Sequence, residues 1–270
     1  MIRQSRRELL KSLSIAIFGC SCTGRALAQG SPWPQGATPN HEKPNEVRVL
    51  AASPNPDDHN WGRFRRAGCT FNRSNANSGA GGIPQIVPYS GNPEVDAAYQ
   101  REGLALVEIF EVKPAGGYFN DSSGPNAFAT PIKYFQNSYD GTIAFGIRLL
   151  DMELRRDYGR GLSVPAIMAH EFAHIYQFMD GSLADVATPV RELHADFLAG
   201  WYMARRNISE SLMKPALDAF FGMGDYHFNS PNHHGTPMQR LRSLLAGYAD
   251  SATSIEEAFQ SGLEHVASIL

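Results

Sequence analysis

The sequence feature that most constrains this chain is the stretch 169–174, which reads Ala-His-Glu-Phe-Ala-His. His170 and His174 are four residues apart, so on an α-helix they lie about 40° from each other and leave the same face one turn apart. This spacing suits two nitrogen ligands on one Zn²⁺, and Glu171 stands beside them as a candidate general base. The alternative is a buried helix with two incidental histidines, because most of the neighbouring residues are apolar.

The residues around this stretch predict one continuous helix. Ser163 and Pro165 are typical of a helix start, and the apolar run that follows gives no reason to stop before Asp180-Gly181. The helix that carries the two histidines should therefore extend over about residues 163–180.

Two histidines leave a zinc ion short of a third protein ligand. Glu192 and Asp196 follow downstream, again four residues apart and hence on one helix face, whereas His194 points about 200° away from Glu192. Glu192 can then bind the metal, and Asp196 can accept a hydrogen bond from the distal nitrogen of a ligating histidine. His194 is expected to be a flanking residue. The alternative for the two carboxylates is a solvated helix face.

Asp180 is the strongest rival for the third position, because His170, His174 and Asp180 have the spacing of the pattern H-E-x-x-H-x-x-G-x-x-[HD]. In that pattern a glycine lets the chain turn back to the metal, but here the place is taken by Gln177. A continuous helix would carry Asp180 about 15 Å along the axis from His170, which is too far to share an ion. Glu192, after the break at Thr188-Pro189, is therefore the better candidate.

Composition and charge describe a globular chain with a basic leader. The 270 residues are 43% hydrophobic and 19% charged, which excludes disorder throughout. The chain has 24 basic and 27 acidic side chains, of which five basic and one acidic lie in residues 1–28. The remaining residues therefore carry 19 basic and 26 acidic side chains, a net charge of −7. This acidic balance argues against nucleic acid as a partner. Without Cys20 and Cys22 of the leader, Cys69 stands alone, so no intramolecular disulfide is expected.

Residues 1–28 are predicted to be an export signal. Ser5–Lys11 resembles the twin-arginine motif, an apolar run over 13–24 follows, and Ala26-Leu27-Ala28 fits a cleavage site. The apolar run is too short to span a membrane. We therefore expect a periplasmic or secreted protein. The alternative is a lipid anchor at Cys20, which the bulky Phe18 disfavours.

The rest of the chain divides into an extension over 29–90, rich in Pro, Gly and Asn, and one domain over 91–270. Turn residues separate short extended segments, and later segments have helical patterns with capping boxes at Thr236 and Ser254. The predicted fold class is α+β, with a small, mostly antiparallel sheet packed on the active-site helix and a helical C-terminal half. The expected helices cover 93–108, 163–180, 189–206, 210–221, 237–248 and 255–270, and the extended segments cover 109–113, 117–119, 126–132 and 141–147.

The combination of H-E-x-x-H with the later Glu192-x-x-x-Asp196 resembles the gluzincin clan of zinc metallopeptidases. Glu192–Gly200 is similar to the E-L-x-A-D-x-x-A-G stretch of small bacterial neutral zinc metallopeptidases, and His234–Arg240 is similar to their H-G-T-x-x-Q-R segment. Asn126–Ala129, with residues 141–150 behind it, resembles the strand and hairpin that precede the active helix in minimal gluzincins. The resemblance covers about residues 93–250 and does not extend to 29–90.

This resemblance implies a zinc metallopeptidase that holds one Zn²⁺ per chain through His170, His174 and Glu192, with Glu171 as general base. His234 precedes a helix start and matches a histidine of the similar families, so it is the candidate oxyanion donor. Its alternative is a structural loop histidine, and Tyr226 and His227 are weaker rivals.

The implied substrate is a peptide or protein, held by an edge strand near Asn126 or Gly141. No membrane-spanning helix is expected, and the sequence does not define the oligomeric state. The competing hypothesis is an exported zinc-bound scaffold or chaperone-like binding module with little hydrolytic activity. An intact Glu171 argues against it, because a site that only holds metal has no need of that carboxylate.

Overall fold

A computed structural model describes residues 84–122, 124–135, 140–156, 162–228, 230 and 233–270. The predicted export signal, Cys69 and nearly all of the predicted extension lie outside these residues. Within the described part, a small mixed sheet comes first and the C-terminal half is helical, so the predicted α+β class is confirmed.

The sheet has four strands in the order β1-β2-β4-β3. The pairs β1–β2 and β3–β4 are antiparallel, and β2–β4 is parallel. β4 is paired on both sides, whereas β3 is an edge strand, so the edge expected near Asn126 or Gly141 belongs to the Asn126 segment. The strand bounds are β1 Ile86–Val87, β2 Ala115–Phe119, β3 Ala127–Thr130 and β4 Thr142–Gly146.

Helix α3, Pro93–Phe110, is longer than predicted. Asn92 caps it, since its side-chain oxygen accepts the backbone N–H groups of Glu94 and Val95 at 3.1 and 3.3 Å. The strand expected over 109–113 is wrong. Phe110 lies four residues after Leu106 on the buried face, so the helical pattern continues through it, and the chain leaves the helix only at Glu111, which has a φ of 55°.

A further difference concerns the residues after β4, where the resemblance suggested a continuing hairpin. The strand ends at Gly146 and helix α4, Ile147–Arg155, begins at once. The carboxylate of Asp121 accepts the backbone N–H groups of Arg148 at 2.7 Å and Leu149 at 2.9 Å, which caps the new helix. The cap comes from a distant segment, and no local sequence signal indicates it.

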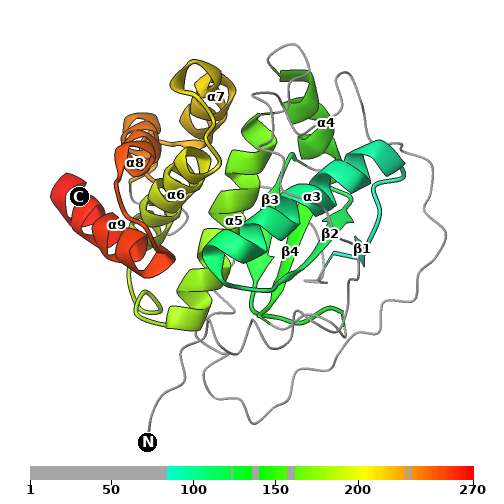
Figure 1. The fold of residues 1–270 in the computed structure, drawn as a ribbon, viewed down its shortest axis with the longest axis horizontal. Coiled ribbons are helices and arrows are strands. Elements are labelled where there is room, and N and C mark those ends of the chain that lie inside the picture. The colour runs from blue at the N-terminus through cyan, green and yellow to red at the C-terminus, as the bar shows by residue number, and fades with distance from the viewer. Residues whose placement is uncertain (1–83, 123, 136–139, 157–161, 229, 231–232) are drawn as a thin grey trace, which may run out of the picture. The chain divides into compact units, whose positions relative to one another are not determined.

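Helix α5, Ser163–Asp180, is the centre of the domain and carries the two histidines. Its residues 163–178 are all buried. It packs against α3 and β3 on one side and against α6 and α7 on the other, as Figure 1 shows. The helix ends where predicted, at Gly181, whose φ of 81° is left-handed and whose N–H donates to the carbonyl of Gln177.

Four helices form the C-terminal half: α6 Thr188–Arg205, α7 Lys214–Met223, α8 Pro237–Ala249 and α9 Ile255–Ile269. The helix expected over 210–221 is divided, because a short 3-10 turn, η4 Glu210–Leu212, precedes α7 and Pro215 stands in the first turn of α7. The capping box at Thr236 is present. At Ser254 only half of the box forms, since the Glu257 carboxylate accepts from Thr253 instead.

Helices α6 and α8 cross with their backbones in contact. A Cβ on Gly247 would lie 1.8 Å from the carbonyl oxygen of Phe197, and one on Gly200 would lie 1.9 Å from that of Leu244. Only glycine fits at such a crossing. The approach brings the first turns of α8 against the face of α6 that carries Asp196. None of the helices in the described residues is long and apolar enough to cross a membrane.

Candidate metal centre

His170 and His174 on α5 meet Glu192 on α6, and all three side chains are buried. The two Nε2 atoms are 3.0 Å apart, and the Glu192 carboxylate oxygens lie 3.5 Å from Nε2 of His170 and 3.7 Å from Nε2 of His174. Ligand atoms about 2.0–2.2 Å from a tetrahedral ion lie roughly 3.3–3.6 Å from one another. The three residues therefore fit one metal ion, with the two-histidine, one-carboxylate donor set of catalytic zinc sites.

Asp196 contacts the far side of the first histidine. Its Oδ1 lies 2.9 Å from Nδ1 of His170, close enough for an ion pair with the protonated ring, and this contact keeps Nε2 toward Glu192. Burial lowers the pKa of His170, but hydrogen bonds and charge from Asp196 and Glu192 outweigh it and raise the pKa to about 9. In the metal-free chain a proton on His170 therefore balances the carboxylates.

Arg240 on α8 completes this side of the site, and the sequence patterns did not assign it a role. Its guanidinium donates two hydrogen bonds to the Asp196 carboxylate, at 2.8 and 2.7 Å, and both side chains are buried. Its guanidinium carbon also lies over the ring of Phe220, 5.8 Å from the centroid, within the range of a cation–π interaction. Arg240 belongs to the H-G-T-x-x-Q-R segment, which was the available signal, but spacing alone could not connect it to Asp196.

The second histidine has a neutral partner. Nδ1 of His174 lies 2.8 Å from Oε1 of Gln177, three residues on and on the same helix face. Burial lowers the pKa of His174 to about 3, so this ring is neutral. His194 does not join the metal-ligating group; its ring lies beyond Gln177, in agreement with the direction that its spacing predicted.

The side chain of Glu171, next to His170 on α5, is fully buried. Neither of its carboxylate oxygens has a hydrogen-bond partner among the described side chains and backbone. Burial raises the pKa of Glu171 to about 8. The charge of His170 lowers this pKa, and the charge of Glu192 raises it further. The backbone N–H of Ala129 on β3 lies near the carboxylate and opposes this increase in the pKa, but it does not meet either oxygen in the geometry of a hydrogen bond. A buried carboxylate without a hydrogen bond is costly, so the chain keeps it here against its own stability.

His234 also contacts the carboxylate of Glu192, through the oxygen that faces His170. Its Nδ1 is 3.0 Å from Oε2 of Glu192, and its backbone N–H donates to Asp225 at 3.1 Å. Burial raises the pKa of the Glu192 carboxyl, but His234, His170 and His174 outweigh it and hold the pKa well below its usual value. His234 thus reaches the site, whereas the weaker rivals Tyr226 and His227 are exposed.

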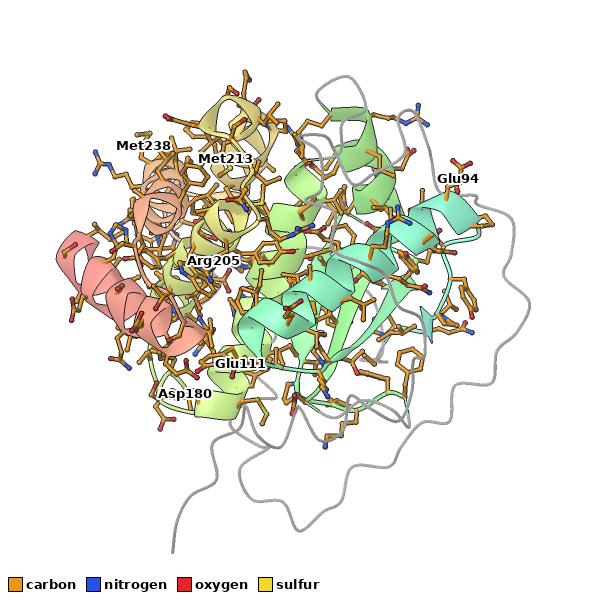
Figure 2. The ribbon with its side chains drawn as sticks, in the orientation of Figure 1. Glu94, Glu111, Asp180, Arg205, Met213 and Met238 are labelled. Atoms are coloured by element: carbon orange, nitrogen blue, oxygen red, sulfur yellow. The ribbon has the colours of Figure 1, made fainter. Side chains whose placement is uncertain are left out.

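Asp180, the rival third ligand, is not part of the group. It stands at the end of α5, where Figure 2 labels it, and it is exposed. Its carboxylate accepts the backbone N–H of Ser182 at 3.0 Å and thereby stabilises the turn after the helix. Among the described residues, the convergent group is His170, His174 and Glu192.

Comparisons of the chain with protein-family models, with curated proteins and with solved structures find no match. The interpretation of this group as a metal site therefore rests on the sequence and on the convergence of His170, His174 and Glu192.

Proposed function

We propose that the chain is a zinc-dependent peptidase of the gluzincin type. The observation that carries the proposal is the carboxylate of Glu171, which is buried and without a hydrogen-bond partner next to a group that fits one metal ion. A zinc ion held by His170, His174 and Glu192 would polarise a scissile carbonyl and would lower the pKa of a bound water towards ~7. A site that only holds metal gives no reason to keep such a carboxylate.

Glu171 is the general base and later the general acid in this proposal. It accepts a proton from the attacking water and returns it to the amine that leaves when the peptide bond breaks. Its oxygens are available for this transfer because no neighbouring donor among the described residues occupies them.

The substrate is proposed to be an extended peptide that pairs with the edge strand β3, Ala127–Thr130. Two facts support this placement: the outer edge of β3 has no neighbouring strand in the described sheet, and Ala129 faces Glu171. A peptide added at such an edge gains main-chain hydrogen bonds irrespective of its side chains. Its scissile bond then lies near the base.

His234 is proposed to stabilise the oxyanion that forms during hydrolysis, but its geometry sets a condition. Nδ1 faces the Glu192 carboxylate at 3.0 Å, so that nitrogen carries a proton. Nε2 can donate to an oxyanion only if the ring is doubly protonated.

For localisation, we propose export through the twin-arginine route and a site of action in the periplasm or outside the cell. The order of paired arginines, apolar run and Ala-x-Ala in residues 1–28 supports this proposal.

The test compares the wild-type chain with Glu171→Gln for hydrolysis of a mixed peptide library and for zinc content. Glu171→Gln keeps the volume of the side chain and the metal ligands but removes the base. We expect unchanged zinc and a loss of hydrolysis by several orders of magnitude. Substantial chelator-sensitive hydrolysis in Glu171→Gln would refute its role as the base. Bound zinc without hydrolysis in the wild type would favour the scaffold or chaperone-like module.

A further inference from the structure

A chain of buried hydrogen bonds leads from helix α9 to the metal-ligating face of His174. The carbonyl oxygen of Phe259 on α9 lies 2.9 Å from Nε2 of His194 on α6. Nδ1 of His194 lies 3.0 Å from Nε2 of Gln177, and Oε1 of Gln177 lies 2.8 Å from Nδ1 of His174. A side contact joins Nε2 of Gln177 to the carbonyl oxygen of Arg191 at 3.0 Å. We refer to Gln177 and His194 as the relay.

The direction of every hydrogen bond in the relay follows from its two backbone ends, because a carbonyl oxygen only accepts. At the Phe259 end, Nε2 of His194 must carry the proton, which leaves a lone pair on Nδ1 of the neutral ring. At the Arg191 end, the NH₂ group of Gln177 must face the carbonyl, and its second N–H then points to Nδ1 of His194.

These two constraints leave Gln177 one orientation, with Oε1 toward His174. That oxygen can only accept, so Nδ1 of His174 must be the donor. In a neutral ring the lone pair is then on Nε2, the atom that faces Nε2 of His170 and the carboxylate of Glu192.

We propose that Gln177 and His194 are positioning residues that hold His174 in the tautomer able to bind a metal through Nε2. The inference rests on the proposed metal centre and adds two residues to it. It also gives α9 a role, since the Phe259 carbonyl is the fixed end of the relay. The amide does this without a further negative charge, in contrast to Asp196 at His170.

The packing of α9 supports this role. The ring of Phe259 meets the ring of His194 edge to face, with centroids 4.5 Å apart. Gly262, one turn on, lies so close that a Cβ there would come within 2.9 Å of the imidazole. His194 is therefore held on two sides by α9 and cannot rotate away from Gln177 without moving that helix.

The first test is the tautomeric state of the histidines, read by NMR on the full-length chain with ¹⁵N-labelled histidine and without metal. We expect His174 to be protonated at Nδ1 and not at Nε2, and His194 to be protonated at Nε2 and not at Nδ1. The opposite state at either ring would overturn the relay. This measurement needs neither metal nor activity. The proposed tautomers can therefore be refuted while the proposed function holds, and the proposed function can be refuted while the tautomers are as expected.

The second test is zinc affinity, measured by competition with a chromophoric chelator. Gln177→Leu removes the acceptor for Nδ1 of His174, and we expect zinc to bind roughly 10- to 100-fold more weakly. His194→Phe leaves Gln177 anchored at the Arg191 carbonyl, so a smaller weakening is expected.

Val266→Ala is the matched control, because it truncates a buried side chain of α9 and leaves every residue of the relay in place. We expect its zinc affinity to stay within about twofold of wild type, since the relay is intact. Equal weakening in Val266→Ala and Gln177→Leu would show a packing effect and overturn the proposal, as would a Gln177→Leu protein with wild-type affinity. If Gln177→Leu does not fold, the tautomers of the wild type decide the question.

Discussion

The buried pair of Asp196 and Arg240 gives the sharpest prediction of stability. Both side chains are almost fully buried, and two hydrogen bonds of 2.8 and 2.7 Å join them. Removal of one partner of such a pair leaves an uncompensated buried charge, which costs about 3–5 kcal/mol. We therefore expect Arg240→Met to lose that much free energy of unfolding, a large share of the ~5–15 kcal/mol of a typical domain.

Removal of both charges should cost much less than the sum of the single changes. In Asp196→Leu/Arg240→Met no charge is left uncompensated, and the main loss is the acceptor at Nδ1 of His170, about 1–3 kcal/mol. The two single variants together predict roughly 6–10 kcal/mol if they were additive. The difference is the coupling energy of the pair, which a double-mutant cycle measures directly.

The assay is urea denaturation in the presence of a chelator, followed by circular dichroism, so that bound metal adds nothing to stability. Lys214→Met is the control, because its ion pair with Asp218 has side chains 74% and 48% exposed and should contribute no more than about 0.5 kcal/mol. An Arg240→Met variant that loses as little stability as Lys214→Met, or additive costs of the single and double variants, would refute a strong coupling between Asp196 and Arg240.

Three further predictions concern helix packing and export. Gly247→Val places a branched side chain where even a Cβ would lie 1.8 Å from the Phe197 carbonyl, so we expect thermal denaturation to show a loss of about 3 kcal/mol or more and a lower zinc content. Gly103→Ala, in the interior of α3 with no atom near its Cβ, should instead gain about 0.5–1 kcal/mol; a loss there would count against the packing described. Replacing Arg6 and Arg7 together with Lys should leave the protein in the cytoplasm on cell fractionation, and normal export would contradict the twin-arginine prediction.

Helical periodicity predicted the metal-ligating group because the spacings are local. The i,i+4 pairs on α5 and α6 fix which side chains share a face, and the continuous apolar run fixes where α5 ends. The α+β class followed from the same local signals. The choice between Glu192 and Asp180 as the third ligand followed from the rise of the α-helix, which carries Asp180 too far from His170. In the structure Glu192 lies beside the two histidines.

Helical spacing could not predict contacts between segments that are far apart in the sequence. Helix α4 depends on a cap from Asp121, which follows β2 and lies more than twenty residues earlier in the chain. Arg240 reaches Asp196 only because α6 and α8 approach at glycines. The relay of Gln177 and His194 ends at a carbonyl of α9. Each depends on tertiary geometry, which residue spacing within one helix does not specify.

The most direct test of the account is the zinc content of purified wild type, Glu192→Ala and Asp180→Ala, measured by elemental analysis after dialysis against a weak chelator. His170 and His174 alone make a poor site, so the account predicts about one zinc per chain in wild type and in Asp180→Ala, and a strong loss in Glu192→Ala. Full zinc occupancy in Glu192→Ala, together with loss in Asp180→Ala, would contradict it.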